Sequence, residues 1–243
     1  MIRKGQDWGD LGTPGSPSSH PDLTVTGDDR DLATTMQAHP GALVWFRPHH
    51  SDLARAVGLA ERPVDASDSQ DASTSEGPGT VVLTIDAIAL DLPGGHHGGR
   101  EASLLAANAV VLGRAPDRLW WGSRARRVTV RVDDRIVHDG PATSVVIASG
   151  QFVRGKDLVP RGHPGDGRIE VQVYAPKRAE RRLMRDRIGT GSHVPHPRIQ
   201  QWSGRSVTVS ARRSWAAEVD NHPIEPTSEI SARVASGQVR LLV

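Results

Sequence analysis

The sequence has no cysteine in 243 residues and few aromatic side chains, namely 6 Trp, 2 Phe and 1 Tyr. Without cysteine there are no disulfides, no thiolate nucleophiles and no cysteine-ligated zinc, so a metal would need carboxylate, imidazole or carbonyl ligands. A chain of this length can bury a core of normal size. That core must come mainly from Val, Leu, Ile and Ala, which favours strands.

Lysine and long apolar runs are also scarce. Only three lysines occur among 30 basic residues, and such an arginine excess is typical of a GC-rich bacterial genome. The longest apolar runs, such as residues 104–112, are shorter than the roughly 20 residues that span a bilayer. No apolar signal segment follows Met1-Ile2-Arg3-Lys4-Gly5. We therefore expect a bacterial protein of the cytoplasm whose membrane contact is peripheral at most.

Local composition divides the chain. Residues 10–30 are rich in Gly, Pro, Ser and Asp and predict an exposed irregular segment. Residues 66–79 carry no large apolar side chain, as in a linker or disordered loop. Between them, 42–46 predicts a short buried strand, and 52–59 predicts one or two helical turns ended by glycine. Three parts are expected: a reduced N-terminal α/β segment (1–65), a disordered linker (66–79) and a β domain (80–243).

From residue 80 onward, short strands separated by turns are predicted. Val128, Val130 and Val132 alternate with polar residues, the period of a half-buried strand, and Asp133-Asp134 predicts a tight turn. The full set of predicted strands is 80–85, 126–132, 144–148, 168–174, 205–210, 215–219, 229–234 and 238–243. One helix is predicted from Pro176 to Ile188, followed by Gly189. The fold class is therefore α+β and predominantly β, with a β-sandwich or barrel-like domain.

Several segments, in order along the chain, carry a family resemblance. The strand Ser144 to Ala148, the segment Leu158-Val159-Pro160 and the turn 164–171 (PGDGRIEV) are similar to the strand, AP segment and DDGLLDV turn of the diacylglycerol kinase and sphingosine kinase family. Residues 191–197 (GSHVPHP) resemble that family's G-x-H-x-x-H-P segment, and 217–223 (AEVDNHP) occupy the place of its DGE-P turn. The resemblance implies a lipid-kinase and NAD-kinase-like β-sandwich domain beside the reduced α/β segment.

The resemblance also implies a reaction and the residues that would serve it. Family members transfer a phosphoryl group from ATP to a lipid hydroxyl, so ATP and Mg²⁺ are the implied cofactors if kinase activity is retained. Ser51 and Asp52 match the nucleotide-binding GTGND segment, and Asp166 matches a carboxylate of the magnesium site. Asp220 and His222 stand where the family has its catalytic turn, with histidine in place of glutamate. A histidine could accept a proton because its pKa lies near neutrality.

The phosphate-binding elements depart from the family pattern. The GGDGT loop is absent, and Pro48-His49-His50 precede Ser51 where glycines are expected. Proline removes a backbone donor and histidine blocks close approach of a phosphate. Because phosphoryl transfer depends mostly on positioning and charge neutralisation, we expect it to be impaired. In that case Asp166 and Asp220 serve only as turn residues, and asparagine should replace either at little cost in stability.

Histidine pairs and an aromatic pair leave further alternatives open. His96-His97 and the pair His193 and His196 have spacings compatible with metal ligation, but no acidic partner is fixed by the sequence. A flexible glycine loop is the favoured account of the first pair, and a packed turn of the second. Trp120-Trp121 lies beside arginines, and paired indoles favour interfaces, although they could also cap the sandwich core.

The arginine-rich surface of residues 177–187 could meet lipid headgroups or nucleic acid. Glu180 and Asp186 interrupt it, which favours a solvated face with helical ion pairs and no nucleic-acid partner.

Three functions are consistent with the sequence. The first is a lipid-kinase-fold protein with impaired phosphoryl transfer, kept as a binding or regulatory module for a lipid headgroup or a nucleotide. The second is a working kinase that uses Asp52, Asp166 and Asp220 with a rearranged phosphate loop, supplied for example by the second chain of a homodimer. The third is a β-sandwich interaction module with no ligand. Tight binding of ATP with magnesium would separate the second from the others.

Overall fold

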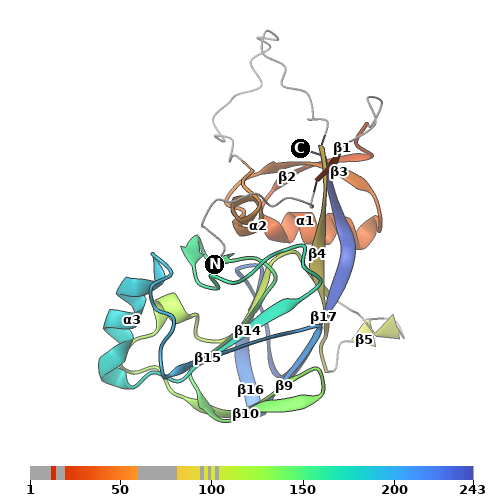
Figure 1. Cartoon of the computed structure of the whole chain (residues 1–243). Helices are drawn as coiled ribbons and strands as arrows, with labels where there is room; N and C mark the ends of the chain where they lie inside the picture. The colour runs from red at the N-terminus through yellow and green to blue at the C-terminus, as the bar shows by residue number, and fades with distance from the viewer. Residues whose placement is uncertain are drawn as a thin grey trace.

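The computed structural model describes residues 12–14, 20–59, 81–93, 96–97, 100–101 and 104–242. Strands dominate this part of the chain, with one 13-stranded sheet and two small two-stranded sheets (Figure 1). The predominantly β fold class is therefore confirmed. The predicted linker 66–79 lies outside the described residues. No helix in the described ranges is long and apolar enough to cross a membrane.

The elements follow one another as β1 (Gly12–Pro14), β2 (Leu23–Gly27), α1 (Asp29–Ala38), β3 (Leu43–Pro48), α2 (Asp52–Ala56), β4 (Val81–Asp91), β5 (His96–His97), β6 (Arg100–Glu101), β7 (Leu104–Ala106), β8 (Ala109–Gly113), η1 (Pro116–Arg118), β9 (Arg126–Val132), β10 (Arg135–Ala142), β11 (Ser144–Ala148), β12 (Phe152–Val153), β13 (Lys156–Asp157), β14 (Ile169–Tyr174), η2 (Arg178–Glu180), α3 (Arg181–Ile188), β15 (Ile199–Gly204), β16 (Ser206–Val219) and β17 (His222–Leu242), where η marks a 3-10 helix.

The N-terminal layer contains two parallel strand-to-helix units. β2 pairs with β3 in parallel, and β3 pairs in parallel with the end of β17. Helices α1 and α2 bury Leu32, Met36 and Leu53 against these strands. The prediction that residues 10–30 are irregular is therefore wrong for β1, which pairs with β4, for β2 and for the start of α1. The short strand β2 is stabilised by parallel pairing with β3, a long-range contact that local composition does not reveal.

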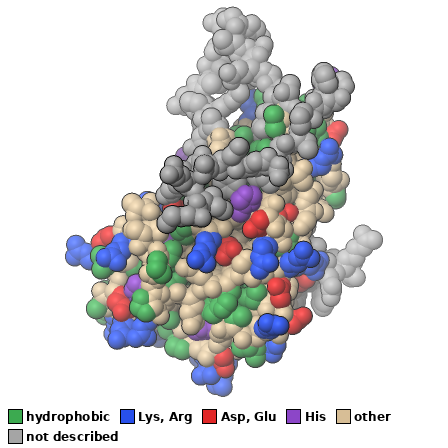
Figure 2. Space-filling view, viewed as in Figure 1, with side chains coloured by type: hydrophobic (Ala, Val, Ile, Leu, Met, Phe, Trp, Pro, Cys, Tyr) green, Lys and Arg blue, Asp and Glu red, His purple; other side chains and the backbone are tan. Residues whose placement is uncertain are grey.

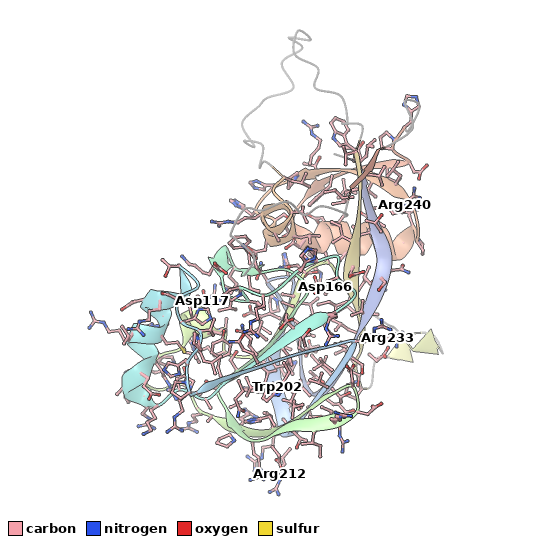
Figure 3. All side chains as sticks on the ribbon, viewed as in Figure 1. Asp117, Asp166, Trp202, Arg212, Arg233 and Arg240 are labelled. Carbon is pink, nitrogen blue, oxygen red and sulfur yellow. The ribbon has the colours of Figure 1, made fainter. Side chains whose placement is uncertain are left out.

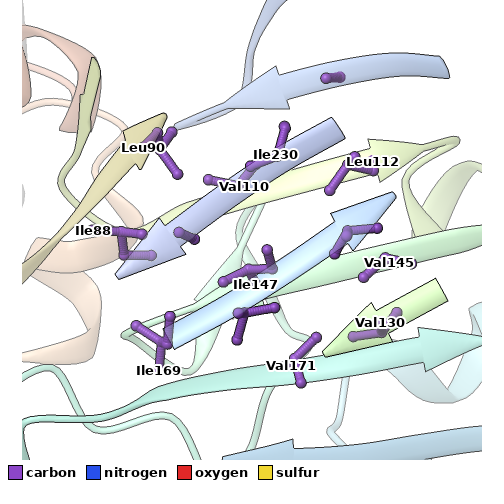
Figure 4. Close-up of a cluster of buried hydrophobic side chains, with 14 of the residues drawn as sticks. Ile88, Leu90, Val110, Leu112, Val130, Val145, Ile147, Ile169, Val171 and Ile230 are labelled. Atoms are coloured by element: carbon purple, nitrogen blue, oxygen red, sulfur yellow. The ribbon is translucent and has the colours of Figure 1, made fainter. Parts of the chain in front are cut away.

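The sandwich is built from antiparallel strands in the order β4-β17-β16-β8-β11-β14-β15, with β9 and β10 extending from β16. Its core consists of Val, Ile, Leu and Ala with one tryptophan, Trp215, as the low aromatic content predicts. Figure 4 shows the side chains of Ile88, Val110, Val145, Ile147 and Val171 between the strands.

Two pairs of predicted strands are continuous in the structure. Segments 205–210 and 215–219 form the single strand β16, with irregular register between Ser210 and Trp215. Segments 229–234 and 238–243 both belong to β17, which shifts register between Ala235 and Val239. Gly237 between them has a φ of 66°, a left-handed conformation that favours glycine. β4 and β17 can thus run from the sandwich into the N-terminal layer, as Figure 1 shows.

The predicted helix from Pro176 to Ile188 is present in a modified form. It begins as the 3-10 turn η2 and continues as α3, which is the one α-helix among the described residues of 80–243. Met184 and Ile188 face the core beneath β8 and β11. Arg181, expected on the surface, is only 5% exposed.

Candidate functional site

A cleft of about 690 Å³ lies where the N-terminal layer meets the sandwich. Its walls come from the start of both helices, from η1, from the β12–β13 turn and from the β16–β17 turn. The lining residues are Asp28, His50, Ser51, Asp52, Arg55, Arg118, Arg154, Gly155, Glu218, Asn221 and Pro223. Because β2 and β3 are parallel, both lead into helices on this side, the usual position for ligands in open α/β sheets.

The first helix that begins at the cleft is capped by its own residues. The Asp28 side chain accepts hydrogen bonds from the backbone N–H groups of Arg30 and Asp31, and Asp31 accepts from the N–H of Asp28 in return. Gly27 makes this possible, since a Cβ there would overlap the Asp31 carboxylate. The reciprocal capping box leaves these donors unavailable to an external anion.

The second helix begins on a buried carboxylate. Asp29 accepts from the N–H of Asp52 at 3.1 Å and from the N–H of Leu53 at 3.2 Å. It also accepts a short hydrogen bond from the Ser51 hydroxyl. Ser51 in turn caps α2 by accepting from the N–H of Ala54 at 2.8 Å. An internal carboxylate therefore occupies the position where a helix N-terminus would otherwise favour a bound anion.

The Asp52 carboxylate connects the two halves of the molecule. Its oxygens accept from the N–H groups of Arg154 at 2.6 Å and Gly155 at 2.7 Å, and from the Asn221 amide at 2.8 Å. Arg154 and Gly155 both have positive φ, so a tight turn presents its donors to this carboxylate. Asp52 therefore holds the β12–β13 and β16–β17 turns against α2.

Asp220 supports a different loop. It accepts three backbone hydrogen bonds of 2.7 to 2.9 Å, from the N–H groups of Ala107, Asn108 and Ala109. Asp220 and Asn221 have φ values of 47° and 66°, which confirms the predicted two-residue hairpin turn. The carboxylate is only 2% exposed, and burial raises its pKa to about 6. Burial, followed by the charge of Asp220, likewise raises the pKa of Asp29.

Charged side chains at the rim pair with one another. His222 places Nε2 2.7 Å from the Asp28 carboxylate. Arg154 donates to Asp117 at 3.3 Å and to Glu218 at 3.0 Å. The rim therefore contains bridged charges that tie the turns together.

Asp166 is not part of this cleft. It is exposed, accepts a hydrogen bond from the N–H of Arg168 at 2.9 Å within its own turn, and lies well apart from Asp117 in Figure 3. The predicted nucleotide and catalytic residues thus come together, whereas the predicted magnesium residue stays outside. Asp52 and Asp220 already accept three hydrogen bonds each, and no group of three or more acidic or histidine side chains among the described residues could hold a metal ion. The implied Mg²⁺ does not fit this arrangement.

The remaining sequence motifs have clear structural positions. His193 is buried, with Nε2 3.1 Å from the Leu158 carbonyl and 3.2 Å from the Tyr174 hydroxyl, as expected of a packed turn. His196 accepts from the N–H of Arg198. His96 and His97 form β5, but their side chains lie outside the described part of the structure.

Comparison with known families gives the class, that of NAD kinase-like proteins with a β-sandwich domain. Residues 120–243 match the model of the YegS C-terminal NAD kinase beta sandwich-like domain. This segment is more than half of the chain, so the chain belongs to that family, within the lipid kinase group that its motifs resemble. No curated protein matches the sequence.

Solved structures agree on the fold. A candidate diacylglycerol kinase from Bacillus anthracis superposes with a TM-score of 0.66 at 14% identity, covering 91% of this chain and 78% of the other. A diacylglycerol kinase from the same organism gives 0.62 at 16% identity, covering 91% and 76%. Yeast NADH kinase in complex with NADH gives 0.51 at 13% identity, covering 90% and 60%. These similarities establish a diacylglycerol kinase-like and NAD kinase-like fold.

Sequence reasoning did not find Asp28, Asp29 and Arg154. The alternation Leu23-Thr24-Val25-Thr26 before Gly27, followed by Asp28 and Asp31 at capping-box spacing, was a usable signal for the first two. No local pattern shows that Arg154 meets Asp117 and Glu218, because those contacts join segments far apart in the sequence.

Proposed function

We propose that this chain is a protein of the diacylglycerol kinase fold in which ATP-dependent phosphoryl transfer is impaired or lost, and that it acts as a binding or regulatory module. The observation that carries the proposal is the Asp29 carboxylate on the first turn of α2. A nucleotide phosphate would have to displace this buried side chain from the N–H groups of Asp52 and Leu53, which it already occupies. Asp52 is also engaged in contacts within the fold, so neither residue is available for positioning phosphates.

Cations in the cleft favour a ligand that carries phosphate. Arg55 and Arg118 are exposed at its walls. Arg55 is fixed in place because it donates to the Gly155 carbonyl at 3.0 Å and lies over the Phe152 ring at 4.6 Å. Guanidinium groups bind phosphate well and need no metal to do so. The proposed ligand is therefore a phosphate-bearing headgroup, from a lipid or a small molecule.

The test uses glycerol 3-phosphate as a soluble probe in thermal denaturation of the full chain. We expect it to raise the melting temperature without magnesium, since a ligand of the native state stabilises that state. Arg118→Ala should reduce the rise, and Arg212→Ala, an exposed arginine on β16, should leave it unchanged. A larger rise with ATP that requires magnesium and is lost in Asp52→Asn would favour a working kinase. No response to any of these compounds would favour an interaction module without a ligand.

A further inference from the structure

Two adjacent indoles are exposed directly after η1. Trp120 is 43% exposed and Trp121 is 67% exposed, and their rings meet edge to face with centroids 5.4 Å apart. The chain has only 6 Trp, and these two do not cap the sandwich core. Large exposed aromatic side chains side by side are a feature of surfaces that bind something.

The fold holds this loop in place. The buried Arg181 guanidinium donates through Nη1 to the carbonyl groups of Trp120, Trp121 and Ser123, at 2.6, 2.9 and 2.8 Å. Gly122 lies against the Trp120 ring, which a Cβ at that position would overlap. The two indoles are therefore presented to solvent by a fixed backbone.

The surroundings of the indoles are positively charged. Arg114 lies over the Trp120 ring at 6.0 Å. Arg124 is exposed three residues after Trp121, and Arg178 is exposed on η2, three residues before Arg181. Asp117, the acidic residue of η1, is bridged to Arg154. Figure 2 shows Lys and Arg side chains along the edge of the molecule formed by α3. We call Trp120, Trp121, Arg114, Arg124 and Arg178 the Trp–Arg surface.

We infer that the Trp–Arg surface docks on the headgroup region of an anionic lipid bilayer. Indole rings favour the interface between water and hydrocarbon, and arginines near an anionic leaflet add electrostatic attraction. A surface that combines fixed indoles with exposed arginines matches this environment in both respects. Arg118 lines the cleft and lies two residues before Trp120, so the Trp–Arg surface is next to one wall of the cleft. This inference does not depend on what the cleft binds.

The experiment measures co-sedimentation of the full chain with vesicles of phosphatidylcholine, with and without phosphatidylglycerol. We expect at least about fivefold tighter binding to the anionic vesicles, weakened by salt. The double variant Trp120→Ser/Trp121→Ser should lose at least about tenfold in affinity. A loss of this size is expected when at least one large apolar side chain no longer enters the bilayer interface. Arg124→Glu/Arg178→Glu should lose binding to anionic vesicles selectively. Brominated lipid should quench tryptophan emission of the wild type more than that of the double tryptophan variant.

Matched controls are available on other strands. Ile136→Ser removes an apolar side chain of β10 that is 56% exposed. Arg212→Glu reverses the charge of an exposed arginine on β16. Both should bind vesicles like the wild type. Equal binding to neutral and anionic vesicles, no vesicle binding at all, or loss of binding in the controls as large as in the tryptophan variant would overturn the inference. Glycerol 3-phosphate binding in the cleft should be unchanged in the tryptophan variant, which separates this result from the proposed function.

Discussion

The cleft and the Trp–Arg surface both adjoin η1 and use charged side chains in opposite ways. In the cleft, the carboxylates of Asp29, Asp52 and Asp220 accept hydrogen bonds from the chain's own backbone. Beside the Trp–Arg surface, Arg181 is buried and donates to the loop, whereas Arg114, Arg124 and Arg178 of the surface are exposed. These three acidic residues therefore stabilise the fold, whereas the exposed side chains of the Trp–Arg surface are cations and indoles.

The largest effect is expected at Asp220. Asp220→Ala leaves three buried N–H groups without acceptors and places alanine at a φ of 47°. We expect a loss of roughly 3 kcal/mol or more in the free energy of unfolding, measured by urea denaturation. Asp166→Ala, which removes one hydrogen bond of an exposed turn, should cost less than about 1 kcal/mol. Similar losses in the two variants would mean that Asp220 does not hold the loop.

The pH dependence of stability should report the buried carboxylates. The pKa of Asp220 is raised from 3.8 to about 6 in the folded state, so the folded chain binds more protons than the unfolded chain between these values. Stability should therefore fall as pH rises from about 4 to about 7, by on the order of 3 kcal/mol. Asp29, whose pKa is also raised, adds to the same trend. Asp29→Asn should flatten the curve, and a wild type that gains stability over this range would contradict the account.

A moderate effect on stability and vesicle binding is expected at Arg181, which holds the loop of the two indoles. Arg181→Met removes a guanidinium that serves three loop carbonyls while keeping an unbranched apolar side chain. We expect a loss of about 1 to 2 kcal/mol, and weaker vesicle binding because the indoles are no longer held together. Vesicle binding equal to that of the wild type would show that the fixed loop is not needed.

The smallest effect is expected at Asp166. Asparagine can accept the same N–H bond from Arg168, so Asp166→Asn should change the melting temperature very little. Addition of magnesium should not alter the melting temperature of either protein, since Asp166 lies outside the cleft. A magnesium-dependent rise in the wild type that disappears in Asp166→Asn would establish a cation site that the geometry does not favour.

The sequence predicted well those features that repeat at short range. Alternating valines predicted β9 with correct bounds, and Asp133-Asp134 and Asp220-Asn221 both adopt the left-handed turns expected of them. Features that depend on distant pairing were not predictable, such as β2 beside β3 and the continuity of β17. The site has the same dependence on distant contacts. The sequence predicted that Asp220 stabilises only its own turn and that asparagine could replace it at little cost. It instead accepts from residues 107–109, and asparagine could not accept all three bonds because its amide nitrogen is a donor.

The chain has a diacylglycerol kinase-like fold, and we propose that it lacks efficient phosphoryl transfer. This proposal can be tested by measuring transfer of radiolabelled phosphate from ATP with magnesium to diacylglycerol in anionic mixed micelles, with the full chain and with Asp52→Asn as the matched variant. We expect no product above a control without protein, for the wild type and the variant alike. Phosphorylated lipid formed by the wild type and lost in Asp52→Asn would contradict the proposal.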